Sequence, residues 1–371
     1  MSMEQSITSS SGILPRTEFT SRCVPMFASR DPDHAQISDT AAIQSKQPEK
    51  EKETMRASTL ESFDSSPALH EVPTPQIAPN EVLVRVHASS INGFDVAVAT
   101  GMLQGMMEYQ FPVTIGRDLA GIVEQVGSEV SRYGVGDEVF GFLATAVLHD
   151  GTWADYVTSP EDTFIAPKPT SLDFLEAGAL PVAGVAALMS VDALDPSEGE
   201  RVLVVGATGG AGSYAVQLAA KRGARVIATT TPDDEDYLRD LGAAETIDYT
   251  QQDVVSTIRE RYPEGIEGLA DFANYPDGFA PLAGLCAPGG RAASTLGAAD
   301  AEGLATRDVR ATNVVGTPDP AVLSRLAELA DSGELRVPVQ RVFSLEEATD
   351  GLDAFQREHV RGKFAISVAA A

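Results

Sequence analysis

Small residues gather in one segment of the chain that could bind phosphate. Gly206-Ala207-Thr208-Gly209-Gly210-Ala211-Gly212 follows the apolar run Val202–Val205 and precedes the helix-forming stretch 213–220. Gly209 and Gly212 are spaced like the last two glycines of G-x-G-x-x-G, and Ala207 stands in place of the first. Small residues there let backbone N–H groups approach a pyrophosphate, whose charge the start of a helix stabilises. Because strand, turn and helix occur together, the segment predicts that residues 207–212 bind a dinucleotide.

The residues after the next strand bear on which dinucleotide binds. An acidic residue about 20 positions beyond the glycines would bind the ribose 2′-hydroxyl of NAD(H). That region carries the neutral Thr229, Thr230 and Thr231, which tolerate a 2′-phosphate, so we expect NADPH, with NADH possible. The acidic run 233–236 leaves an alternative open. It either begins a helix, where acids complement the dipole, or faces the ribose and repels a phosphate.

The pattern around this turn predicts the elements that position it. From about residue 171, strands and helices alternate, at 201–205, 211–222, 225–229, 233–241 and 246–248. Such alternation implies a parallel, doubly wound sheet. Residues 55–170 instead hold strand-like segments between glycine-bearing turns, and the last segment, 319–371, adds helices and a closing strand. The fold class is therefore α/β, with a β-rich region beside a parallel sheet.

Composition narrows the classes of partner. The 371 residues, long enough for two domains, carry 54 acidic and 27 basic side chains, for a formal net charge of -27. So acidic a surface argues against nucleic acid as a partner. Two cysteines, Cys23 and Cys286, cannot build a disulfide framework, which fits a cytoplasmic location. No apolar run is long enough to span a membrane, and no secretory signal is evident at the N-terminus. Residues 1–54 are polar and aperiodic, and we expect them to form a disordered arm.

Further short motifs occur in a fixed order along residues 55–368. They are Ser90-Ile91-Asn92-Gly93-Phe94-Asp95, Ile115-Gly116-Arg117-Asp118-Leu119-Ala120-Gly121, Val135–Gly141, Ala179-Leu180-Pro181, Leu285–Arg291 and Arg361-Gly362-Lys363. Together with the glycine turn, this series resembles the medium-chain dehydrogenase/reductase superfamily, specifically its zinc-free quinone oxidoreductase-like branch. The resemblance implies a GroES-like, β-rich catalytic domain, 55–180, completed by 316–371. A Rossmann domain, 181–315, is inserted between its two parts, and the active site should lie in the cleft.

The same motifs also indicate whether the protein has residues that could bind zinc. Zinc-dependent members of this superfamily place a Cys in the first motif and a His in the second, where this chain has Asn92 to Asp95 and Gly116-Arg117-Asp118. The four-cysteine structural zinc lobe is missing as well, so we expect no zinc. Without a metal, hydride delivery to a conjugated electrophile is easier than alcohol oxidation, because hydrogen bonds can stabilise the charge on a distant oxygen. The expected substrate is a quinone or an α,β-unsaturated carbonyl.

Candidate catalytic residues follow from the first motif and from two unplaced side chains. We expect Asn92, with Asp95 in the same motif, to position nicotinamide or substrate, although an ordinary turn role for Asn92 stays open. Many relatives carry a Tyr where this chain has Ala97, so the proton donor is unassigned. Tyr109 and His149 are possible substitutes, and solvent is a third source of the proton.

The resemblance supplies two more cofactor candidates. Tyr249 resembles a family position near the adenosine side, and Lys363 could approach the cofactor phosphates; an ordinary strand-end aromatic and a solvated lysine are the alternatives. Relatives that use NADPH often carry a Lys where this chain has Asp234, so no phosphate clamp is assigned. Two other functions stay open: an enoyl-thioester reductase of a biosynthetic pathway, and a cofactor-binding protein without redox turnover. The family commonly forms homo-oligomers, so we expect a dimer.

Overall fold

The computed structural model describes residues 53–317 and 319–369. Most of the arm expected at 1–54 therefore lies outside the described residues. The last residue of that range, Thr54, begins strand β1 (Thr54–Leu60). The side chains of Met55 and Ala57 in this strand are buried in a small hydrophobic cluster. Among the helices of the described part, none is both long and apolar enough to cross the hydrocarbon core of a membrane.

The β-rich region is built around a seven-stranded sheet. Its order is β10 (Ile165–Pro167), β7 (Glu138–Phe142), β6 (Asp118–Val126), β3 (Glu81–Ser90), β18 (Lys363–Ser367) and β17 (Val339–Ser344), and β9 (Tyr156–Pro160) also pairs with β3. A smaller sheet joins β2 (Ala68–Pro73), β1 and β5 (Val113–Thr114), and β4 (Glu108–Tyr109) pairs with β8 (Val147–Leu148). Helices α1 (Gly93–Ala99), α2 (Phe174–Ala179) and α10 (Ala348–Arg357) accompany these strands.

The end of the chain completes this sheet. Strand β18 pairs antiparallel with β3, with Ala365 opposite Ser90. Lys363 at the start of β18 is thereby brought close to Asn92, which follows β3 and caps α1.

The second sheet is parallel throughout. Its order is β13 (Glu245–Asp248), β12 (Arg225–Thr230), β11 (Arg201–Val205), β14 (Ile266–Asp271), β15 (Cys286–Ser294) and β16 (Arg310–Asn313). The helices are α3 (Pro181–Leu194), α4 (Gly210–Lys221), α5 (Glu235–Asp240), α6 (Val254–Arg261), α7 (Pro276–Ala283), α8 (Ala301–Ala305) and α9 (Pro320–Asp331), with a short 3-10 turn at Pro232–Asp234. This arrangement confirms the predicted doubly wound α/β fold.

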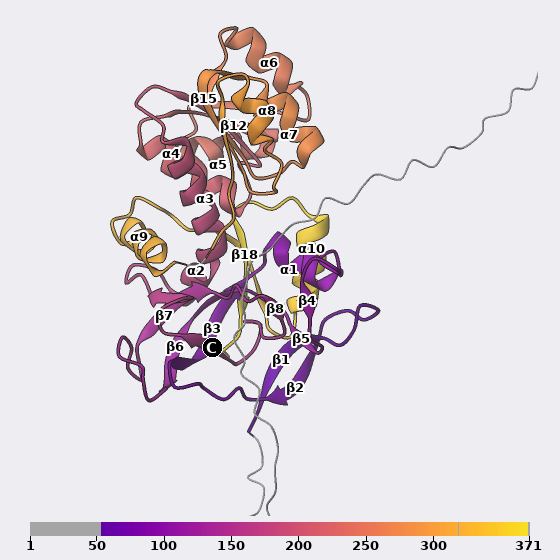
Figure 1. The fold of residues 1–371 in the computed structure, drawn as a ribbon, viewed down its shortest axis with the longest axis vertical. Helices are drawn as coiled ribbons and strands as arrows, with labels where there is room; N and C mark the ends of the chain where they lie inside the picture. The colour runs from indigo at the N-terminus through magenta and orange to yellow at the C-terminus, as the bar shows by residue number, and fades with distance from the viewer. Residues whose placement is uncertain (1–52, 318, 370–371) are drawn as a thin grey trace, which may run out of the picture. The chain divides into compact units, whose positions relative to one another are not determined.

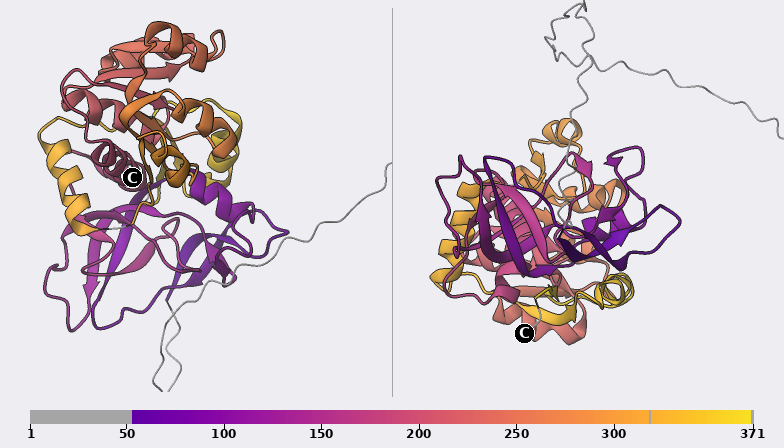
Figure 2. Two further views of the ribbon diagram at one scale, coloured as in Figure 1. Left: turned by 45° about the horizontal axis from the view of Figure 1, so that its top comes forward. Right: turned by 90° about the horizontal axis from the view of Figure 1, so that it is seen from below.

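Burial explains why these strands form the centre of the sheet. Along β11, Val202 and Val204 pack into one hydrophobic cluster, which includes α3 and α4, and Leu203 packs into another, which includes α6 and α7. Successive side chains of a strand point to opposite faces, so a strand that is apolar at every position needs helices on both sides. Figures 1 and 2 show these helices flanking the sheet.

Helix α3 connects the two sheets. It contacts β6 and β7 of the first sheet and β14 and β15 of the second. Figure 1 shows α2 and α3 between them. We propose that the GroES-like catalytic domain spans residues 55–180 and 316–371. The Rossmann domain then spans residues 181–315.

Candidate active site

The glycine turn joins β11 to α4. Gly206 adopts a positive φ of 73°, which favours glycine, and Gly209 caps the helix. A Cβ atom added at Gly212 would lie 2.0 Å from the Gly206 carbonyl oxygen, so no larger residue fits there. The first intrahelical bond runs from the Ser213 N–H to the Gly209 carbonyl. The N–H groups of the first helical turn before Ser213 therefore remain available to an anion, which is what a pyrophosphate requires.

The C-terminal segment closes directly onto this turn. The Gly362 N–H donates to the Thr208 carbonyl at 2.7 Å. The Lys363 side chain then crosses the start of α4, because a Cβ atom added at Gly210 would lie 2.5 Å from Lys363 Cδ. The ammonium group itself lies elsewhere. The Lys363 stem borders the turn, and its ammonium lies against the Asn92 amide and the Asp118 carboxylate. Binding of the cofactor phosphates by Lys363 stays a prediction.

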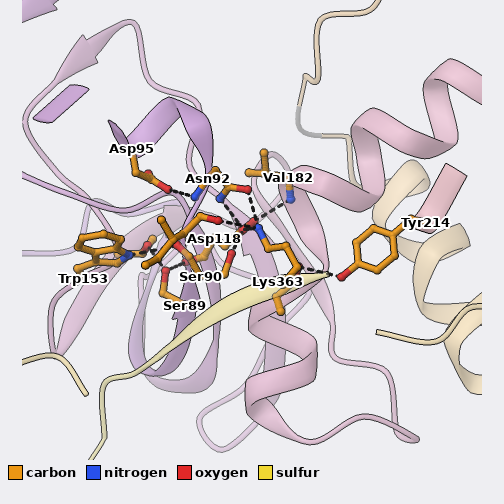
Figure 3. A network of polar contacts seen from close by, with 12 residues as sticks. Ser89, Ser90, Asn92, Asp95, Asp118, Trp153, Val182, Tyr214 and Lys363 are labelled. Atoms are coloured by element: carbon orange, nitrogen blue, oxygen red, sulfur yellow. Dashed lines mark hydrogen bonds and ion pairs between the residues drawn. The ribbon is translucent and has the colours of Figure 1, made fainter. Parts of the chain in front are cut away.

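Lys363 ends in a buried polar network (Figure 3). Its Nζ donates to Asn92 Oδ1 at 2.6 Å and to the Ile91 carbonyl at 3.1 Å, and it lies 3.5 Å from Asp118 Oδ2. Only 3% of Lys363 is exposed. Burial lowers the pKa of Lys363, and the charges of Asp118 and Asp95 oppose that fall.

Asp118 holds the other side of the network. Its Oδ2 accepts hydrogen bonds from Asn92 Nδ2 at 2.8 Å and from Ser90 Oγ at 2.5 Å. Its Oδ1 accepts the Val182 N–H at 2.7 Å, in the first turn of α3. Lys363 and Asp118 together fix the orientation of the Asn92 amide. Among the described residues, only one hydrogen bond of that amide's Nδ2 is found, the one to Asp118, and 8% of Asn92 is exposed.

Asp95 stabilises the start of α1. It is fully buried, and its carboxylate accepts the Asn92 N–H at 2.7 Å, which forms a capping box. Burial raises the pKa of Asp95 to about 7, against the hydrogen bond from Asn92, and the charge of Asp118 adds to the rise. Lys363 and Arg117 act in the opposite direction. The structure thus brings Asn92, Asp95 and Lys363 together, with Asp95 acting on the backbone of Asn92.

The raised pKa of Asp95 predicts a pH-dependent stability. Between its ordinary value of 3.8 and about 7, the folded protein keeps Asp95 protonated while the unfolded chain ionises it. The stabilisation is therefore complete at low pH and is lost as the pH rises to about 7. In this window the wild type should lose up to about 1.4 kcal/mol per pH unit relative to an Asp95→Asn variant. Urea unfolding of both proteins across the window measures this, and a difference that does not change with pH would contradict it.

Tyr109 and His149 lie apart from this network. The Tyr109 hydroxyl donates to the Val98 carbonyl at 3.3 Å, and the ring packs edge-on against Phe63. Nδ1 of His149 lies 2.9 Å from the Gln110 carbonyl oxygen and 3.0 Å from that of Pro112. The structure therefore does not bring these two sequence-predicted candidates together with Asn92.

The expected adenosine-side residues lie where β12 and β13 end. Thr229 Oγ accepts the Gly206 N–H at 3.3 Å, and the fully buried Thr230 donates to the Thr231 carbonyl. The Thr229 hydroxyl thus supports the glycine turn, whereas the Thr230 hydroxyl bonds to its neighbouring residue, and of the three threonines only Thr231 is partly exposed. Tyr249 follows the neighbouring strand β13, and 51% of it is exposed. The Tyr249 N–H donates to the Thr230 carbonyl at 3.2 Å, and an exposed aromatic ring is suited to stacking on a base.

The sequence did not show how Asp234 is paired. This buried carboxylate accepts a hydrogen bond from Thr231 Oγ at 2.9 Å and one from Arg361 Nε at 2.7 Å, and it lies 2.5 Å from His359 Nε2. Burial by itself would raise the pKa of Asp234, but these hydrogen bonds lower it. The negative charge of Asp234 is therefore balanced by the guanidinium of Arg361, in the loop before β18, and it does not face the site as a free charge.

No group of three or more His, Cys, Asp or Glu side chains among the described residues is placed to hold a metal ion. A parallel sheet whose glycine turn begins a helix is the arrangement of a dinucleotide-binding domain.

Comparisons with known proteins agree with this class. A model of the alcohol dehydrogenase GroES-like domain matches residues 78–170, and a model described as zinc-binding dehydrogenase matches residues 241–366. The mouse protein "NAD(P)H oxidoreductase RTN4IP1, mitochondrial" is 29% identical over 335 residues, which cover 78% of this chain and 82% of that protein. The Arabidopsis thaliana "NADPH-dependent alkenal/one oxidoreductase, chloroplastic" is 28% identical over 300 residues, or 79% of this chain and 73% of that one.

The solved quinone oxidoreductase of Coxiella burnetii shares the fold. It superposes with a TM-score of 0.77 at 27% identity, and the match covers 85% of this chain and all of that one. This chain belongs to the medium-chain dehydrogenase/reductase superfamily and is an oxidoreductase of the medium-chain reductase type. The GroES-like and Rossmann domains expected from the motifs are confirmed.

Proposed function

We propose that this protein transfers hydride from NADPH to a quinone or an α,β-unsaturated carbonyl without zinc. The observation that carries the proposal is the path from the glycine turn to Asn92 through Lys363. The Lys363 stem borders Gly210 and its ammonium holds Asn92. A pyrophosphate bound on the turn would therefore be linked through Lys363 to the Asn92 amide, which could bind a carbonyl. The quinone oxidoreductase and alkenal/one oxidoreductase names among the relatives support the same substrate classes.

The residues present fit a dinucleotide. The free N–H groups at the start of α4 would bind the pyrophosphate, and Tyr249 and Thr231 would border the adenosine. When bound, the nicotinamide supplies the hydride. Asn92, held by Lys363 and Asp118, would orient the nicotinamide or the substrate, and solvent would supply the proton. The zinc-free mechanism rests on Asn92 and Arg117 standing where zinc-dependent relatives carry ligands, because amide and guanidinium groups are poor zinc ligands.

The preference for NADPH rests on the pairing of Asp234. Arg361 is partly exposed beside Thr231 and Asp234, so its guanidinium can meet a 2′-phosphate there. We expect Arg361→Ala to weaken NADPH binding about tenfold or more and NADH binding much less, because a charged hydrogen bond contributes about 1.5–3 kcal/mol. Isothermal titration with both cofactors measures this, with Arg341→Ala as an exposed control. Equal losses for both cofactors would refute the assignment.

The activity itself is tested with purified protein, NADPH or NADH, and three acceptors. These are 1,4-benzoquinone, an enone and a crotonyl thioester, and the loss of nicotinamide absorbance is followed. We expect oxidation of NADPH with the quinone or the enone, faster than that of NADH. Preference for the thioester would indicate an enoyl-thioester reductase. Tight cofactor binding without turnover on any acceptor would refute a reductase.

Two expectations keep the status of proposals. One is a homodimer, which size-exclusion chromatography with light scattering would test. The other is a cytoplasmic location, and here the relatives point elsewhere, since the names of the mouse and Arabidopsis proteins include "mitochondrial" and "chloroplastic".

A further inference from the structure

Gly210 is a glycine that the backbone of the turn does not require. It is the first residue of helix α4, in a conformation that any L residue adopts, and alanine favours a helix more than glycine does. It is not one of the two glycines whose spacing matches G-x-G-x-x-G, which are Gly209 and Gly212. A further cause must therefore explain the glycine at position 210.

The Lys363 side chain supplies that cause. A Cβ atom added at Gly210 would lie 2.5 Å from Lys363 Cδ, and 3.3 Å from both Lys363 Cγ and Ala183 Cβ. Ala183 lies in the first turn of α3, so small residues at the starts of α3 and α4 leave a passage for the lysine stem. Any side chain at position 210 would enter this passage.

The Lys363 stem cannot move aside at low cost, because both of its ends are held (Figure 3). At the backbone end, the Lys363 N–H donates to the Pro338 carbonyl at 2.9 Å, and Lys363 begins β18. At the other end, Nζ donates to Asn92 Oδ1 at 2.6 Å and lies 3.5 Å from Asp118 Oδ2. A stem pushed by a new side chain would therefore pull the ammonium away from Asn92 and Asp118.

We propose that Gly210 is a positioning residue, whose missing side chain lets Lys363 cross the start of α4 and hold the Asn92 amide at a set place relative to the glycine turn. This inference rests on the proposed function, in which the turn binds the dinucleotide and Asn92 orients nicotinamide or substrate. In this role Gly210 acts through Lys363 and not through its own N–H group, which alanine retains. A methyl group at position 210 therefore affects turnover more than cofactor affinity.

Kinetics and cofactor binding separate this role from a direct role in holding the cofactor. We expect Gly210→Ala to lower kcat about 10–100-fold, because a displacement of about 1 Å can cost this much. NADPH affinity, measured by isothermal titration, should change little. Gly134→Ala, whose added Cβ would lie 3.9 Å from the nearest atom, is the matched control and should behave as wild type. Wild-type kcat in Gly210→Ala, or a loss of NADPH affinity as large as the loss of kcat, would overturn the proposal.

A stability cycle tests the contact without turnover. In the wild-type background, Gly210→Ala should lower the midpoint of thermal unfolding, because the new methyl group displaces the Lys363 stem. A Lys363→Ala/Asp118→Asn background removes both the stem and the charge that it balances. There the same substitution should leave the midpoint unchanged or raise it, since alanine favours the helix. An equal lowering in both backgrounds would overturn the proposal.

A pH measurement needs only variants that keep Lys363. The charge of Lys363 lowers the pKa of Asp95, so movement of the ammonium away from Asn92 should raise that pKa further. The pH window in which the protein loses stability relative to Asp95→Asn should therefore extend to higher pH when both proteins also carry Gly210→Ala. An unchanged window would overturn the proposal. If the cycle and the pH shift appear but no acceptor is reduced, the Gly210–Lys363 contact is supported and the proposed reaction fails.

Discussion

Replacement of Lys363 by methionine is expected to destabilise the folded protein by about 3–5 kcal/mol, because breaking a buried ion pair leaves its partner charge uncompensated. Lys363 is the only described cation within ion-pair distance of Asp118, and it also fixes Asn92 Oδ1. Its loss should therefore lower both the free energy of unfolding and the turnover rate. Urea unfolding followed by circular dichroism measures the first effect.

Two variants make the Lys363 result interpretable. Lys221→Met removes a lysine that is 57% exposed, and we expect a change within about 0.5 kcal/mol. The double variant Lys363→Met/Asp118→Asn removes both charges, so it should be more stable than the sum of the two single losses predicts. A Lys363→Met protein no less stable than Lys221→Met would show that the network does not support the fold.

Gly212→Ala is expected to open the glycine turn and to abolish tight cofactor binding. The new Cβ atom would lie 2.0 Å from the Gly206 carbonyl oxygen, so the backbone must move. Such overpacking costs about 1–3 kcal/mol, and NADPH affinity should fall at least about tenfold because the N–H groups no longer converge. Thermal unfolding with and without NADPH measures both effects.

The controls for Gly212 use glycines whose surroundings accept a methyl group. At Gly134 the nearest atom to an added Cβ is 3.9 Å away, so Gly134→Ala should leave stability and affinity unchanged. At Gly209 the nearest atom is 3.6 Å away and φ is −71°, so Gly209→Ala should fold normally and weaken NADPH only through contact with the phosphate. NADPH binding by Gly212→Ala at wild-type affinity would contradict the role of the turn.

The sequence predicted those features of the fold that depend on neighbouring residues in the chain. The apolar run before Gly206, the small residues after it and the alternation of strands and helices predicted the parallel sheet and the turn, because each element's pattern is contained in its own residues. The motif around Asn92 likewise pointed to a segment that lies in the buried polar network of the candidate active site.

The sequence did not show which side chains pair with residues far away in the chain. Lys363 lies 271 residues from Asn92 in the chain, and Asp234 lies 127 residues from Arg361, so no spacing rule predicts either pair. The ammonium of Lys363 pairs with Asn92 and Asp118, and the carboxylate of Asp234 pairs with Arg361. Tyr109 and His149 were singled out by residue type alone, and their polar atoms contact backbone carbonyls instead. Asp118 could have been favoured from its motif, since a buried acid beside a strand needs a strong partner.

The most direct test of hydride transfer uses NADPH that carries deuterium at its transferable C4 position, together with a cyclic enone and the full-length protein. Mass spectrometry and NMR of the reduced ketone locate the label. Hydride transfer from NADPH predicts one deuterium at the β-carbon and a proton from solvent at the α-carbon. A product without deuterium at the β-carbon, or the absence of any reduced product from every quinone and enone tried, would contradict it.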